Sequence, residues 1–390
     1  MKYRVCRMML GIAVLCMLSS WAWAGEGALS PVVSGVQEVA QYNFAIHILA
    51  MLLVGFGFLM VFVRKYGYGA TTGTYLVVAV GLPVYLLLRS CGILCGERIA
   101  PSTIKALIYA EFAVASALIA MGAVLGRLRV FQYALLALCL IPAYLLNEWL
   151  VLDGGSGMTH GFVDTAGSII IHAFGAYFGI GLTLALTTQQ QRSQPITSDA
   201  TSDRFAMIGS MVLWLFWPSF CSAIVPLQEM PQTVVNTVLS LSGATISTYF
   251  LSTLLRKGKT SIADMANAAL AGGVAIGATC NIVAPVDAFG IGLLAGAVCV
   301  IGYVFVQPAL ETRFKIVDTC GVHNLHGMPG LLGGLIVLCV VPGSAKTQLI
   351  GMAITVALAL GCGLVAGTLI QVTGTTRLAY DDHEDFAGIE

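Results

Sequence analysis

Long apolar stretches alternate with short polar loops along almost the whole chain. Each stretch has about the length of a helix that crosses a bilayer, which needs about 20 predominantly apolar residues. The stretches are continuous rather than alternating residue by residue, which argues against a β-barrel. We therefore predict an all-α polytopic membrane protein. Its eleven membrane-spanning helices are expected at residues 43–63, 71–88, 104–126, 130–150, 164–187, 205–225, 234–255, 262–283, 288–309, 322–341 and 347–373.

The first 24 residues have the pattern of a secretory signal peptide. Lys2, Arg4 and Arg7 precede the short apolar run 8–18, and Ala22-Trp23-Ala24 resembles a cleavage site. A retained first membrane helix is the alternative. We expect a cleaved signal peptide at 1–24, an eleven-helix domain at 25–376 and a short cytoplasmic tail at 377–390.

The composition excludes most other classes of protein. Hydrophobic residues make up 58% of the chain and charged residues 10%, whereas soluble domains carry about 25% charged residues. The net charge is zero, so nothing indicates a nucleic-acid partner. Most cysteines sit singly in apolar stretches, and only Cys91 and Cys95 are close enough in a predicted outer loop to form a disulfide, with two free thiols as the alternative.

The positions of the basic residues predict the orientation. Cytoplasmic loops of a membrane protein carry an excess of Lys and Arg. With an external N-terminus, twelve basic residues fall on the cytoplasmic side, at 64, 65, 127, 129, 192, 204, 256, 257, 259, 313, 315 and 377. Four fall outside, at 89, 98, 105 and 346. Acidic residues gather instead on the predicted outer side, where they would attract cations. They are Glu97, Glu111, Glu148, Asp153, Glu229 and Asp287.

Four ionisable residues lie within or at the ends of apolar spans, where such residues are usually functional. Asp164 opens the fifth span, with His172 eight residues later, and Asp318 precedes the tenth span, with His323 five residues later. Spans 1–5 and 6–10 form two blocks of five, so the second block starts from the opposite side of the membrane. This is the layout of an inverted repeat, whose functional site lies near the midplane.

We predict that His172 and His323 face each other across a central path. Neutral imidazoles offer both a donor and an acceptor, and a low-dielectric site favours passage of a neutral solute. Asp164 and Asp318 are each expected to cap a helix N-terminus. A metal site is the less favoured alternative, because His323, His326, His172 and Asp318 would have to converge from different depths. Each histidine could also be a structural residue.

Aromatic residues near the outer ends of two spans suggest a gate. Phe112 lies in the third span and Phe220 in the sixth, at equivalent depths in the two halves. Two stacked rings would exclude water and hydrated ions, although a single phenylalanine in a span is usually plain packing.

The segments FVDTAGSIIIHAFGAYFG and DTCGVHNLHGMPGLLGG resemble the signatures of the Rhesus (Rh) branch of the ammonium transporter (Amt/Mep/Rh) family. The resemblance implies the ammonium transporter fold, with eleven spans in two inverted five-helix repeats plus a last helix, and a homotrimer with a pore in each subunit. It implies that His172 and His323 are the twin pore histidines and that Phe112 and Phe220 form the gate. Asp164 and Glu148 would recruit ammonium at the outer vestibule.

Departures from the family pattern refine this expectation. The position of a Trp that completes a cation–π cage in the ammonium-transporter branch is Leu152 here, and Trp149 is out of register. A missing cage weakens ammonium capture and fits a low-affinity channel. There is no N-x-S/T sequon, and the tail from Asp381 to Glu390 does not resemble one that docks regulatory PII proteins.

The sequence therefore predicts a homotrimeric ammonia channel of the bacterial inner membrane, neither an enzyme nor a cofactor-binding protein. Ammonium, ammonia and methylammonium are the expected solutes, and the resemblance adds carbon dioxide. A proton-coupled carrier of another small solute is the alternative, and a membrane sensor or metal-binding protein is a third.

Overall fold

The structure is a computed structural model that describes residues 31–93, 98–374, 376 and 379–388. The predicted signal peptide and Cys95 lie outside these residues, so the structure tests neither the cleavage site nor the Cys91–Cys95 pair. Every regular element in the described part of the chain is a helix.

Ten helical stretches are long and apolar enough to cross a membrane. Their elements are α2 Pro31–Ala50 continued by η1 Met51–Phe56, α3 Gly57–Leu59 and η2 Met60–Phe62; α4 Gly67–Ser90; α5 Ile104–Ala123; α6 Val130–Val151; η3 Ser168–Ala173 with α7 Phe174–Leu186; α9 Ala200–Ser222; α10 Met230–Leu255; α13 Pro285–Ile301 with η4 Gly302–Val306 and α14 Gln307–Phe314; η5 His323–Gly327 with α15 Met328–Val340; and α16 Ala345–Val372. Short helices α8 Gln189–Ser193 and η6 Asp382–Glu384 lie in loops.

The eighth predicted span differs from the others. The sequence predicted one helix over 262–283, but the structure has α11 Ile262–Ala268 and α12 Ala271–Ile276, followed by turns. The carbonyls of Gly277 and Ala278 accept hydrogen bonds from the backbone N–H groups at the start of the fifth span. They are therefore not used in helical hydrogen bonds within the eighth span. A tertiary contact therefore ends this span early.

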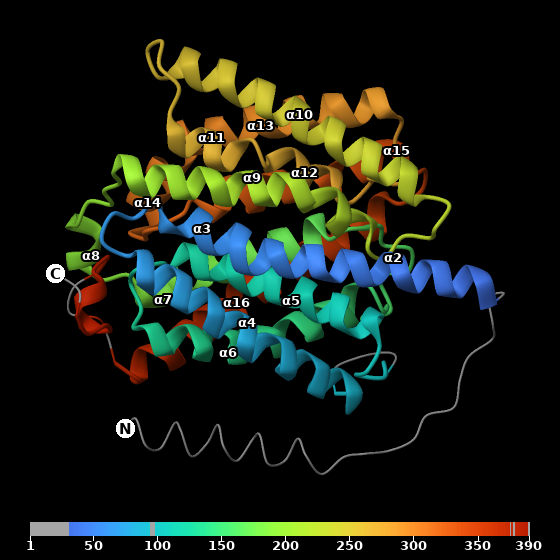
Figure 1. The fold of residues 1–390 in the computed structure, drawn as a ribbon, viewed down its shortest axis with the longest axis horizontal. Coiled ribbons are helices and arrows are strands. Elements are labelled where there is room, and N and C mark those ends of the chain that lie inside the picture. The colour runs from blue at the N-terminus through green and yellow to red at the C-terminus, as the bar shows by residue number, and fades with distance from the viewer. Residues whose placement is uncertain (1–30, 94–97, 375, 377–378, 389–390) are drawn as a thin grey trace.

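The helices lie side by side along the long axis of the molecule (Figure 1). In this view α4, α5 and α6 lie below α9, and α10 and α13 lie above it. Small residues allow close approach: a Cβ on Gly363 of α16 would lie 2.1 Å from the carbonyl oxygen of Phe178 in α7. A Cβ on Gly292 of α13 would lie 1.9 Å from that of Ser240 in α10. Such close packing is typical of helices associated in lipid.

Hydrogen bonds between the two halves follow a reciprocal pattern. The turn that starts the fifth span bonds with the end of the eighth, and the turn that starts the tenth span bonds with the end of the third. The bonds are Ala166 N–H to Gly277 C=O (2.8 Å), Thr165 N–H to Ala278 C=O (3.5 Å), Cys320 N–H to Gly122 C=O (3.2 Å) and Thr319 N–H to Ala123 C=O (3.1 Å). This exchange is what an inverted repeat of two five-span units requires, as the sequence predicted.

Residues near the C-terminus dock onto one end of the bundle, which we call the tail end. The carboxylate of Asp382 accepts hydrogen bonds from the N–H groups of Tyr68 (2.9 Å) and Gly69 (2.7 Å) at the start of α4. The carboxylate of Asp385 accepts one from Val130 N–H (3.1 Å) at the start of α6. Two helix N-termini therefore have caps supplied from a distant part of the chain. The other end of the bundle, where α5 begins at Ile104, is called the entrance end below.

Candidate functional site

Asp164 caps the helical segment that carries His172. One carboxylate oxygen, Oδ2, accepts hydrogen bonds from the N–H groups of Ile169 (2.9 Å) and Ile170 (2.8 Å). Burial raises the pKa of Asp164 to about 7, and these backbone donors act in the opposite direction. The predicted helix cap is therefore confirmed.

Asp318 caps the corresponding segment in the second half. Its two carboxylate oxygens accept hydrogen bonds from Val322 N–H and His323 N–H, both at 3.0 Å. Burial raises the pKa of Asp318 to about 6, again opposed by its backbone donors. The second predicted cap is confirmed as well.

The two capped segments are π-helical and bring two imidazoles together. Nδ1 of His172 in η3 lies 3.2 Å from Nδ1 of His326 in η5. The ring centroids are 5.3 Å apart and the rings are within 10° of parallel. Single π-helical turns occur frequently at functional sites, because they reorient side chains within a continuous helix.

The predicted partner of His172 is wrong, since the facing ring belongs to His326 and not to His323. The backbone N–H of His323 bonds to Asp318, and its ring packs edge-on against Tyr177 at 5.7 Å. His323 is thus turned away from the ring of His172, which faces His326 instead.

A regular spacing in the sequence identifies His326. Asp164-Thr-Ala-Gly and Asp318-Thr-Cys-Gly are the same motif, and a histidine follows each aspartate by eight residues, at 172 and 326. In an inverted repeat, residues that lie equally far along two related segments occupy equivalent positions in the two halves. The five-residue spacing to His323 has no counterpart in the first half.

The predicted aromatic pair lies directly beside the histidine pair. The rings of Phe112 and Phe220 are 4.6 Å apart between centroids, at an angle of 47°. The ring of Phe220 lies 6.1 Å from that of His172. The two phenylalanines are therefore in contact, as the sequence predicted, but their rings are tilted and not stacked as expected.

Trp217 is a neighbour that the sequence analysis missed. Its ring stacks on His172 at 5.5 Å and 21°, and its indole N–H has no hydrogen-bond partner among the described residues. The signal was its position three residues before Phe220, which places both rings on one face of α9. His172 Nε2 is also buried without a protein partner in this part of the chain.

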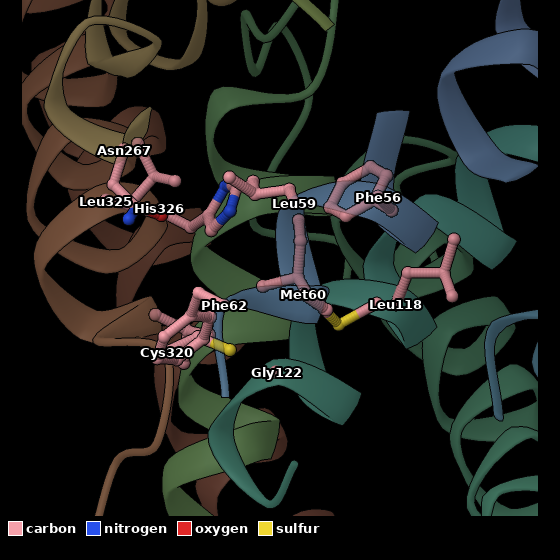
Figure 2. A pocket seen from close by; sticks show the side chains of 12 residues that line it. Phe56, Leu59, Met60, Phe62, Leu118, Gly122, Asn267, Cys320, Leu325 and His326 are labelled. Atoms are coloured by element: carbon pink, nitrogen blue, oxygen red, sulfur yellow. The ribbon is translucent and has the colours of Figure 1, made fainter. Parts of the chain in front are cut away.

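A narrow cavity of about 20 Å³ lies on the tail-end side of His326. Figure 2 shows the imidazole projecting into it toward Leu59 and Met60, with Cys320 on its lower side. This volume accommodates about one water-sized molecule. Leu59 and Cys320 also line a larger cavity of about 210 Å³ that includes Asp203 and Gln307. The path thus widens toward the tail end.

A hollow of about 390 Å³ lies at the entrance end, on the opposite side of the aromatic and histidine pairs from these cavities. The ring of Tyr109 contacts both this hollow and the aromatic pair, since it lies 6.4 Å from the ring of Phe112. The lining residues are Gln37, Glu38, Gln41, Thr103, Ile104, Lys105, Tyr109 and Ile224.

Neither acidic residue predicted at the vestibule lines this hollow. Glu148 is 4% exposed, accepts a hydrogen bond from the Tyr85 hydroxyl (2.9 Å) and lies 3.5 Å from the Arg89 guanidinium. Asp164 is 8% exposed and serves as a helix cap. Both carboxylates are enclosed by protein groups, and their recruiting role stays a prediction. The acid at the hollow is Glu38, which sequence reasoning did not single out.

The metal alternative finds no support in the described residues, where no group of three His, Cys, Asp or Glu side chains could hold an ion. The site consists of two facing imidazoles, aromatic rings and apolar walls. Such an arrangement offers hydrogen bonds to one small polar molecule at a time in surroundings that disfavour an ion.

Comparison with known proteins finds relatives among ammonium transporters of the Rh type. Ammonium transporter Rh type B of Mus musculus is 44% identical over 294 residues, which are 73% of this chain and 63% of the relative. The chain therefore spans less than two thirds of that relative's length. Ammonium transporter Rh type A of Bos taurus is 36% identical over 86% of this chain and 80% of its own length.

Solved structures agree with these relatives. Rh50 of Nitrosomonas europaea, a channel of the Rhesus protein family, is 68% identical with a TM-score of 0.91, over 92% of this chain and 94% of that chain. A sensor Amt protein shares the fold with a TM-score of 0.79 at 19% identity, over 93% and 99% of the two chains. The sequence profile of the Ammonium Transporter Family matches residues 7–389. This chain belongs to the ammonium transporter family.

Proposed function

We propose that this protein is a channel that conducts ammonia across the membrane, along the line from the Tyr109 hollow to the cavity beneath His326. The observation that carries the proposal is the His172–His326 contact directly beside the Phe112–Phe220 pair. A passage built from rings and one narrow cavity suits a solute of the size of ammonia.

The chemistry follows from desolvation. Moving an unpaired cation into an apolar interior costs far more than moving a neutral amine or amide. An ammonium ion therefore gives up its proton to bulk water in the solvent-open Tyr109 hollow, and neutral ammonia passes the aromatic pair. Nε2 of His172 offers an unpartnered nitrogen for a hydrogen bond along the way. The two Nδ1 atoms share one hydrogen, so both imidazoles are neutral. Together they offer a series of hydrogen-bonding positions along the path.

The orientation is part of the proposal. The excess of basic residues in loops such as those at Arg64, Arg127 and Arg256 supports a cytoplasmic tail end and an outward-facing hollow. A bacterial inner membrane and a homotrimer follow from the resemblance to Rh proteins. Light scattering of the detergent-solubilised protein tests the trimer.

Stopped-flow recording of internal pH in proteoliposomes tests the function. Under an inward ammonium gradient, the protein should speed alkalinisation above bare lipid. Rates equal to those of bare lipid would overturn the proposal. Carbon dioxide and methylammonium gradients in the same vesicles define the range of solutes, and saturable flux of a larger solute would favour a proton-coupled carrier.

Histidine variants test the site with a matched control. We expect His172→Ala and His326→Ala to lower the ammonia rate by about fivefold or more, because each removes a hydrogen-bonding group from the path. His323→Ala should leave the rate close to that of the parent protein. Normal rates in His326→Ala together with a low rate in His323→Ala would contradict the assigned pair.

A further inference from the structure

One aromatic ring lines the hollow at the entrance end. Tyr109 is the one aromatic side chain among its described lining residues, and its ring lies between the hollow and Phe112. Glu38 supplies a carboxylate to the same hollow. Gln41 belongs to it too, and its side chain donates a hydrogen bond to the carbonyl of Ala223 (3.4 Å). An aromatic face beside oxygen acceptors is a setting that attracts cations.

The aromatic face already has an occupant from the chain itself. Nζ of Lys105 lies 5.9 Å from the centre of the Tyr109 ring, within the range of a cation–π contact. Lys105 is exposed and lies in the first turn of α5, where a positive charge opposes the helix dipole. No ion pair joins Lys105 to a carboxylate in the described part of the chain. Neither helix stability nor an ion pair within the described residues explains its position.

We propose that the Tyr109 ring is a cation-binding face above the aromatic pair and that Lys105 is a tethered competitor for it. The ε-ammonium of Lys105 carries the same charge and the same kind of N–H donors as an arriving ammonium ion. An ammonium ion must displace it before reaching Phe112, so Lys105 keeps the entrance in a low-affinity state. This inference rests on the proposed channel function and adds a residue that sets its affinity.

The first test compares Lys105→Gln with Lys346→Gln in proteoliposomes. Lys346 is a matched control, because it is an exposed lysine at the same position of the first turn of α16 and lies outside the hollow. A solvent-exposed cation–π contact corresponds to about a two- to fivefold effect on affinity. At low ammonium concentration Lys105→Gln should conduct about two- to fivefold faster, and Lys346→Gln should match the parent protein.

A third variant makes the test specific to the ring. In a Tyr109→Leu background, Lys105→Gln should change the rate no further, because the face for which both cations compete is gone. An unchanged or lower rate in Lys105→Gln, or an equal increase in Lys346→Gln, would overturn the proposal.

A second measurement does not depend on conduction. The protein in vesicles is treated briefly with an amine-acylating reagent, and mass spectrometry gives the labelling of each lysine. Tetramethylammonium chloride should raise the labelling of Lys105, relative to sodium chloride at equal ionic strength, because it displaces the side chain from Tyr109. Lys346 should not respond. Equal labelling of Lys105 in both salts would overturn the inference even if the channel conducts, and a rise in vesicles that do not conduct would sink only the proposed function.

Discussion

The two Asp–His motifs use the same backbone design at opposite ends of the molecule, with different polar partners. Each begins with an aspartate that caps a π-helical segment, followed after three residues by a glycine with positive φ, at 167 and 321. In the first motif a single oxygen of Asp164 accepts both hydrogen bonds, whereas in the second both oxygens of Asp318 are used. The comparison indicates that the repeat preserves the placement of the histidines and leaves the surrounding hydrogen bonds free to diverge.

The fifth position of the motif shows the same divergence. Ser168 donates a hydrogen bond to the carbonyl of Val274 (2.6 Å) and accepts one from Ala278 N–H (2.7 Å), so it ties η3 to the broken eighth span. The equivalent residue is Val322, which packs in the core. Four tests can break or sharpen this comparison.

The largest effect should come from the motif glycines. A Cβ on Gly321 would lie 2.3 Å from a ring carbon of Tyr303, and a Cβ on Gly167 would lie 2.4 Å from the terminal methyl of Ile171. Both substitutions add the strain of a positive φ, about 1–2 kcal/mol, and Gly321→Ala also collides with a rigid ring. We expect losses of about 3–5 kcal/mol for Gly321→Ala and about 2 kcal/mol for Gly167→Ala in the free energy of unfolding in mixed micelles. Equal losses would show that the Tyr303 ring moves aside freely.

The cap oxygens predict a difference between two amide variants. Asp318→Asn replaces an accepting oxygen by a donor and should cost about 1–3 kcal/mol of unfolding free energy. In Asp164→Asn the amide oxygen can take the place of Oδ2, which accepts both hydrogen bonds, and the NH₂ group can take the place of Oδ1, which has no partner. This substitution should therefore lower the free energy of unfolding by less than about 0.5 kcal/mol. The exposed cap Asp199, which accepts from Thr201 and Ser202 N–H, provides the control. Asp199→Ala should lower the stability, because it removes the acceptor of both hydrogen bonds.

Ser168 tests the link that the second motif lacks. Ser168→Ala removes one buried donor and one buried acceptor and should cost about 1–2 kcal/mol of unfolding free energy. The control is Ser193→Ala in α8, an exposed serine whose hydroxyl bonds only to the carbonyl of Gln190 (2.8 Å). That substitution should stay within about 0.5 kcal/mol. A loss in Ser193→Ala as large as that in Ser168→Ala would contradict the assigned link.

The smallest effect is a difference in pH dependence. The pKa values of Asp164 and Asp318 are raised to about 7 and about 6, so each folded site holds its proton to a higher pH than the unfolded chain does. The stability from each protonated carboxyl is present below the unfolded value of about 4 and is lost as pH rises through the folded value. Asp164→Asn and Asp318→Asn should therefore each flatten the stability curve relative to the parent protein, in thermal unfolding scans from pH 4 to 8. A variant whose curve keeps the slope of the parent protein would contradict the raised pKa of that carboxyl.

Hydropathy predicted most of the fold because membrane helices satisfy their backbone hydrogen bonds internally. The fourth span was expected at 130–150 and is found at Val130–Val151. The first helix begins earlier than predicted, at Pro31 instead of residue 43. The eighth span ends early, since its last turn gives its carbonyls to Ala166 and Thr165. That exchange is a long-range contact that no local pattern of residues specifies.

The site was predictable in part. His172 was identified because it is an ionisable residue within an apolar span, and Phe112 and Phe220 because they lie at equivalent depths in the two halves. Asp164 and Asp318 were identified because aspartate is preferred at helix N-termini. The burial of Glu148 beside Arg89 was not predictable, because a carboxylate near a span end looks alike in sequence whether it faces water or an arginine. Lys105, Tyr109 and Phe112 follow one another at four and three residues on α5, so their contacts were within reach of the sequence. The hollow was not, because Glu38 and Gln41 of α2 complete it only in the assembled fold.

The docking of Asp382 onto α4 has a consequence for the order of biosynthesis. The carboxylate that caps Gly69 is 313 positions later in the chain. At 5–20 residues per second, a ribosome delivers it roughly 15 to 60 s after the start of α4 has been made. During that interval the second span waits in the membrane with its first amides unprotected. A nascent chain that stops short of Asp382 would lack the acceptor for the amides of Tyr68 and Gly69.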